Sequence, residues 1–424
     1  MPGRVVSFVG WLDHSEAEQR QVRELLQLFS EKGTVDDLGI GTIRDSISNR
    51  LFPGTSVIQS RARYFLFVPW IFERAEQRHP ADLVKKAELM ERKLIPVLQQ
   101  GADKEGLIGS RAGKDVRTLP SAIYWTGLTA YGIFLRPGMT RAQYGRAARR
   151  GLLPVDTEDE LADRSPSSWH RSIPAAPEEL FEFDRERPVD FALTAEEARW
   201  LLERVLSTEK LRGPNLLGSY ASDVGAIPTS DDGYFWDLPL PDGTTSGTRE
   251  LVAHAQRFSA AVEGASILYN VLLHDERNDD DQGDSDSSAE LRARFGDWAD
   301  ASSSIDLETW AGDLSSFWST ATASGRLPRG ARAFVDDWCS MLHRKPLAGL
   351  LNDSEAHTLI IDRERRHKKA QARFGNAARL RSWRGDSGLA PLDFRWGQVR
   401  RFLRDIRAGL QLEDAGAVTD ASNR

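Results

Sequence analysis

Cysteine is nearly absent from this sequence. Among its 424 residues the only cysteine is Cys339. A lone cysteine cannot form an intramolecular disulfide and cannot hold zinc by itself, which agrees with a reducing compartment. Cys339 lies among apolar residues at helical spacing, so we expect a buried structural thiol rather than a nucleophile.

Long apolar runs are also missing. The longest one, residues 64–72, has nine residues, far short of the roughly 20 that cross a bilayer. The first residues lack the long apolar region and the small-residue cleavage site of a secretory signal. These absences predict a cytoplasmic protein that does not associate with a membrane.

Recognisable catalytic and metal-binding motifs are lacking as well. The eight histidines show no pair at the spacing of zinc ligands, and no Gly-x-Ser-x-Gly elbow is present. The acidic tract 275–288 departs from a calcium loop because Ala289 stands where a bidentate glutamate is needed. We therefore expect no metal and no cofactor. Catalysis stays open, because carboxylates that meet only on folding leave no linear motif.

A glycine-rich segment, residues 106–115, resembles a phosphate-binding loop only in part. That motif needs a glycine and then a serine or threonine at two positions where this chain has Ile108 and Asp115. The simpler interpretation is a solvated loop, although three cations in and beside it could touch phosphates: Arg111, Lys114 and Arg117.

Helical patterns account for most of the chain. A capping box at Thr194 with Glu197 opens one helix, and residues 249–274 are apolar nearly all round, as in a central helix. A further helix is expected from Thr55 to Val68, with a kink or restart at Pro69. The sequence predicts a mainly α-helical protein of two domains with long irregular connections. The expected parts are an N-terminal helical domain 1–150, a linker 151–188, and a C-terminal helical domain 189–424 with the acidic loop 275–288 and basic C-terminal helices.

Positive charge is concentrated near the C-terminus. The net charge is -7, yet residues 363–384 carry nine cations against Glu364, and residues 395–407 carry five against Asp405. Such segregation suggests a polyanionic partner, or an acidic surface on which the basic end docks. A helix from Ser354 would place four of these cations on one face. A second helix over 396–410 would carry four more, of which Arg400, Arg401 and Arg404 are candidate contacts.

These cations are the candidate contacts to the phosphate backbone of a nucleic acid. Two arginines beside the apolar run 64–72 offer a second contact or a structural pair. The alternative is a solvated helix surface whose aromatic residues face the core. The full candidate set is Arg363, Arg366, Lys369, Arg373, Arg400, Arg401, Arg404, Arg61 and Arg63.

Several short motifs together resemble one bacterial family of uncharacterised function. The motifs are Gly10-Trp11-Leu12-Asp13 and the stretches 38–45, 51–56, 61–70, 119–128 and 394–396. The resemblance implies proteins encoded beside helicases and phospholipase D-like proteins in phage-defence neighbourhoods. It carries no established catalytic residue.

Three functional hypotheses follow. The first is a non-catalytic nucleic-acid-associated subunit of a bacterial anti-phage defence system, which contacts the phosphate backbone through the C-terminal basic helices. The second is a protein-interaction scaffold for a helicase, nuclease or phospholipase D-like partner. The third is a metal-dependent effector enzyme whose site is assembled only on folding.

Overall fold

The structure is a computed structural model that describes residues 36–153, 168–181, 189–231, 233–279, 285–322, 325 and 327–422. Within these ranges the fold is mainly helical, and an isolated bridge between Phe134 and Trp169 takes the place of any sheet. The predicted fold class is confirmed. None of the described helices has the combination of length and apolarity that a membrane crossing requires.

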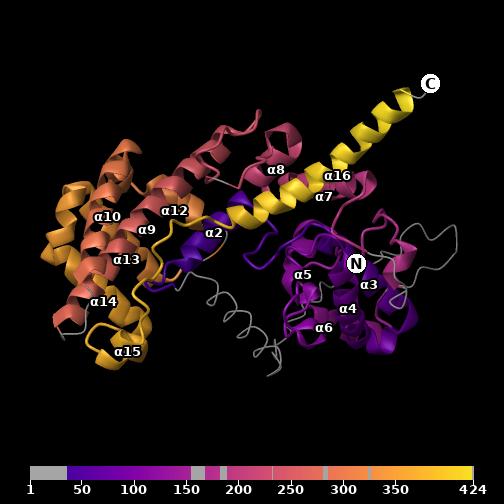
Figure 1. Cartoon of the computed structure of the whole chain (residues 1–424), viewed down its shortest axis with the longest axis horizontal. Coiled ribbons are helices and arrows are strands. Elements are labelled where there is room, and N and C mark those ends of the chain that lie inside the picture. Colours follow the sequence, from indigo (N-terminus) through magenta and orange to yellow (C-terminus); the bar gives the residue numbers. More distant parts are fainter. Residues whose placement is uncertain are drawn as a thin grey trace, which may run out of the picture.

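The helices form two lobes with a layer between them (Figure 1). The first lobe contains α3 (Tyr64–Arg78), α4 (Leu83–Gln100), α5 (Pro120–Ala130) and α6 (Arg141–Arg149). The second contains α9 (Ser246–Asp279), α10 (Ser285–Ser304), α11 (Leu307–Gly312), α12 (Ser315–Thr322), α13 (Arg329–Arg344), α14 (Ser354–Lys368) and α15 (Ala377–Arg381). Between them lie α7 (Ala195–Arg212), α8 (Leu216–Ser222) and α16 (Trp396–Ser422). Short 3-10 turns occupy Pro80–Asp82, Gly113–Asp115, Glu178–Phe181, Val224–Ala226, Leu347–Asn352 and Lys369–Gln371.

Helix α3 is the centre of the first lobe. Every residue from Tyr64 to Phe72 is buried, and the helix continues through Pro69 to Arg78. The prediction that this helix begins near Thr55 is wrong. Tertiary partners take the backbone amides there: the Tyr124 hydroxyl accepts from Ser60 at 2.8 Å, and the Asp405 carboxylate accepts from Ala62 at 2.8 Å. Those bonds hold the segment in turns until α3 begins.

The chain interleaves the two lobes. Helix α2 (Gly41–Leu51) packs against α9 and α12 of the second lobe, and α16 packs against α7. The Ser46 hydroxyl donates to the Ala321 carbonyl at 2.5 Å, across 275 residues of sequence. One continuous apolar core runs from Leu38 to Ile406. The division into domains 1–150 and 189–424 stays a prediction, although contacts such as these cross it.

Local sequence patterns predict several features of the helices correctly. Thr194 and Glu197 form the expected capping box of α7. Helix α9 covers the expected central helix but runs on to Asp279, and α10 already begins at Ser285. Most of the expected acidic loop 275–288 is therefore helical. Cys339 is fully buried in α13, where burial raises the pKa of its thiol, so the expected structural role is confirmed.

Candidate nucleic-acid interface

Arg61 and Arg63 lie inside the molecule and hold elements together. Arg61 is 9% exposed and bonds Asp405, with its Nε 3.0 Å from Oδ2. Arg63 is 7% exposed and donates to Glu197 of α7 at 2.8 Å. Of the two roles foreseen for these arginines, the structure shows the structural pair. Neither guanidinium is placed to receive a nucleic acid.

The four cations expected on one face of a helix from Ser354 do not share a face. Helix α14 ends at Lys368, and Lys369 leaves it with a φ of 52°. Arg363 donates to the carbonyls of Leu38 and Gly39 at 2.7 and 3.0 Å. The prediction of a single basic face is therefore wrong.

Carboxylates of the same chain neutralise much of this region. The guanidinium of Arg373 lies 3.0 Å from Asp37. Arg366 pairs with Asp362 at 2.9 Å but is 78% exposed at its side chain, and Lys369 is exposed as well. Glu364 is completely buried and accepts from the backbone N–H of Arg373 at 2.8 Å. Arg373 therefore has an acidic partner in another part of the chain.

The three candidate arginines on α16 also meet acidic residues. Arg404 bonds Asp231 at 2.5 Å, and Arg400 lies 3.4 Å from the same carboxylate. Arg401 pairs with Glu105. The side chains of Asp231 and Glu105 are 82% and 70% exposed. Only the Arg401–Glu105 pair is exposed on both sides, whereas the side chain of Arg400 is 10% exposed. Exposed pairs contribute little, typically about 0–1 kcal/mol, so a phosphate can displace Glu105 from Arg401.

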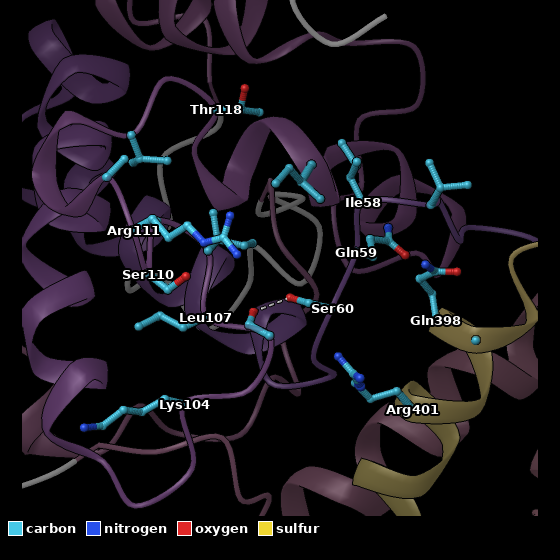
Figure 2. A pocket seen from close by; sticks show the side chains of 18 of the residues that line it. Ile58, Gln59, Ser60, Lys104, Leu107, Ser110, Arg111, Thr118, Gln398 and Arg401 are labelled. Atoms are coloured by element: carbon cyan, nitrogen blue, oxygen red, sulfur yellow. Dashed lines mark hydrogen bonds between the residues drawn. The ribbon is translucent and has the colours of Figure 1, made fainter. Parts of the chain in front are cut away.

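Two of these arginines, Arg400 and Arg401, line a hollow in the structure. It is a groove of about 940 Å³ between the segment 104–118 of the first lobe and the first turns of α16. Five cations line it together with Asp231 as the single acidic residue: Lys104, Arg111, Arg117, Arg400 and Arg401. Figure 2 shows Lys104 and Arg111 on one wall and Gln398 and Arg401 on the other. We call this hollow the basic groove.

The wall formed by residues 104–118 is an ordered loop. The hydroxyl of Ser60 donates to the Gly106 carbonyl at 2.6 Å (Figure 2), and the hydroxyl of Tyr64 accepts from the Ile108 amide at 3.0 Å. Arg92 of α4 donates to the Val116 carbonyl at 2.7 Å. Gly106 has a φ of 76°, and a Cβ there would lie 2.9 Å from the side chain of Arg61. The loop therefore rests on the buried Arg61–Asp405 pair.

The chemistry of the basic groove is divided between charge and apolar surface. Lys104, Arg111 and Arg117 are exposed, whereas apolar side chains such as Ile58 and Leu107 also line the hollow. Guanidinium and ammonium groups of this kind bind phosphates, and apolar surface suits the bases or sugars attached to them. No cluster of three or more metal-ligating side chains occurs among the residues that the structure describes.

Sequence reasoning found the two walls of the groove separately. The charge pattern points to Arg400 and Arg401, whereas the glycine-rich loop is most simply interpreted as solvated. Lys104 and Gln398 were missed, because nothing local in the sequence connects them with a loop or helix some 290 residues away. The signal that was available was the set of cations in the loop that resembles a phosphate-binding loop.

A family model described as "Family of unknown function (DUF6361)" matches residues 6–409. The chain belongs to the DUF6361 family. The DUF6361 match includes both walls of the basic groove and the buried pairs beneath it. Neither the curated proteins nor the solved structures that were compared contain a match to the chain.

Proposed function

We propose that this DUF6361 protein is a non-catalytic, nucleic-acid-associated subunit of a bacterial anti-phage defence system, and that the basic groove contacts the phosphate backbone. The observation that carries the proposal is the meeting of five cations from two distant segments around one open hollow. Phosphate contacts supply affinity without reading sequence. The defence setting is supported by the resemblance to proteins encoded beside helicases and phospholipase D-like proteins.

The proposal changes the set of contact residues. Arg61, Arg63, Arg363 and Arg373 serve the fold through the buried or half-buried bonds described above. Arg404 is held beside the groove by Asp231. The four contacts that we propose are Lys104, Arg111, Arg117 and Arg401. Arg400 is only 8% exposed and lies 3.4 Å from Asp231, so it adds positive charge beneath the groove without being counted as a contact.

A scaffold for a partner protein is the second candidate. It is favoured by the pairing of the basic C-terminal segments with acidic residues of the same chain, such as Arg373 with Asp37. Pairing of this kind explains the charge segregation without a nucleic acid. In this alternative, a helicase or phospholipase D-like protein would be the partner.

Reversing two charges of the groove, Arg111→Glu with Arg401→Glu, is expected to weaken binding of a single-stranded oligonucleotide by at least about 30-fold. Four phosphate contacts predict a slope of log K against log salt of about -2.8 for a single strand, and the loss of two contacts predicts about -1.4. Fluorescence anisotropy of a labelled oligothymidylate of about 12 nucleotides, titrated at several salt concentrations, measures both quantities.

The matched control is Arg366→Glu with Lys369→Glu, which makes the same change of charge at the exposed end of α14. We expect this control variant to bind the oligonucleotide with an affinity within about threefold of that of the unmodified protein. Its changed charges lie outside the groove and act there only through a screened, long-range electrostatic interaction. Equal losses in both variants would place the contact outside the groove. No salt-dependent binding by the unmodified protein, together with co-purification of a helicase, would favour the scaffold.

A further inference from the structure

The first turn of α16 presents unsatisfied backbone donors at the basic groove. The amide of Trp396 donates to the Asp393 carbonyl at 2.8 Å, and that of Val399 donates to the Arg395 carbonyl at 3.0 Å. For the amides of Gly397 and Gln398, which line the groove, no acceptor occurs among the described residues. Helix N-termini with free amides bind phosphate, because the donors and the helix dipole both favour negative charge.

One carboxylate bonds to the backbone at this end of the helix: Oδ1 of Asp393 accepts from the Arg395 amide at 3.0 Å, which leaves the amides of Gly397 and Gln398 available. The turn contains no acidic residue, whereas Arg400 and Arg401 follow it directly. The side-chain Oε1 of Gln398 is buried without a hydrogen-bond partner, and its amide group lies at the groove (Figure 2). An unsatisfied buried amide oxygen is unfavourable, so a rearrangement of this side chain around a ligand would cost little.

Gly397 leaves the backbone open to a ligand. The residue is exposed, and a Cβ built on it would meet no atom within 4 Å. Glycine in a helix is less favourable than alanine by roughly 0.5–1 kcal/mol, and no internal contact requires it here. The missing side chain therefore leaves room for a ligand to approach the main chain at this point.

The size of the groove restricts what can enter. A hollow of about 940 Å³ is comparable to sites that enclose small ligands, about 300–1,000 Å³. It can hold a short stretch of one strand with its bases turned toward the apolar wall, whereas a duplex would have to stay outside.

We infer that the basic groove binds single-stranded nucleic acid and seats one phosphate on the backbone amides of Gly397 and Gln398, opposite Arg111. This inference rests on the proposed function, because it names the strand and the anchor at the same groove. The amides hold the phosphate by directed hydrogen bonds, while the surrounding cations supply the salt-dependent part of the affinity.

The test is Gly397→Ala, with Gly247→Ala as the matched control. Both glycines are the second residue of a helix, α16 and α9, and neither has an atom within 4 Å of a built Cβ. The added methyl group at residue 397 is expected to weaken binding of the oligothymidylate by about tenfold, because it obstructs the seat. The salt slope should stay unchanged, since all the cations remain. Gly247→Ala is expected to bind as the unmodified protein does.

A second arm compares the oligothymidylate with a duplex of equal length. We expect the single strand to bind at least about tenfold more tightly at the same salt concentration. Equal binding by Gly397→Ala and the unmodified protein, or equal affinity for duplex and single strand, would overturn this inference while leaving the proposed function intact. Absence of salt-dependent binding to either probe would overturn both.

Discussion

Replacing Asp405 with alanine is expected to lower the free energy of unfolding by about 3 kcal/mol. The Oδ2 of this carboxylate accepts from Nε of Arg61 at 3.0 Å and from the Ala62 amide at 2.8 Å, and its Oδ1 forms an ion pair with Nη2 of Arg61 at 3.0 Å. Its loss leaves the Arg61 guanidinium buried with a weaker partner. The expected loss lies at the lower end of the range for a broken buried pair, because Asp103 still faces the guanidinium.

Urea unfolding followed by tryptophan fluorescence measures the loss for Asp405→Ala. Arg366→Ala is the control, since it breaks a pair whose arginine is 78% exposed and should change stability by less than about 1 kcal/mol. Asp405→Ala should also loosen the loop that forms one wall of the groove, because Gly106 rests on Arg61. A variant as stable as the unmodified protein would show that this pair does not support the fold.

The second large effect is a pH dependence at Glu91 of α4. Glu91 is 1% exposed, and burial raises the pKa of its carboxyl group to about 7, although the amide and hydroxyl of Ser121 donate to it. The folded chain therefore binds a proton more tightly than the unfolded chain does. The resulting stabilisation is complete below about pH 4.5 and is lost as the pH rises to about 7.

Glu91→Gln should abolish this dependence, because the amide resembles the neutral carboxyl group in shape and has no proton to lose. At pH 8 the variant is expected to be more stable than the unmodified protein by up to about 3 kcal/mol. At pH 4.5 the two should be similar. Urea unfolding at a series of pH values gives both curves, and parallel curves would mean that Glu91 is charged in the folded chain across the series.

The sequence was sufficient for features whose cause is local. The capping box at Thr194 and the apolar pattern around Cys339 specify helices through neighbours on the chain itself, and the structure contains both. The failures have a tertiary cause. Residues before Tyr64 are kept out of a helix by Asp405, more than 340 residues away, and no local propensity reports such a partner.

The candidate site illustrates the same limit for charge. The number of cations identifies the α16 wall of the groove, because arginines close together on one helix are visible as a cluster in the sequence. The number of cations alone does not distinguish Arg401 from Arg373. Arg401 forms an exposed ion pair with Glu105, whereas Arg373 is bonded to Asp37 and Tyr269. That distinction depends on which carboxylates the fold brings near each cation.

The position of α2 has a consequence for synthesis on the ribosome. Its apolar residues Ile43, Ile47 and Leu51 are fully buried, partly by α12, which lies some 275 residues further along the chain. At about 5–20 residues per second, roughly 15 to 55 s pass between the emergence of α2 and that of its partner. During this interval the nascent chain exposes an amphipathic helix that only a chaperone or another part of the polypeptide can cover.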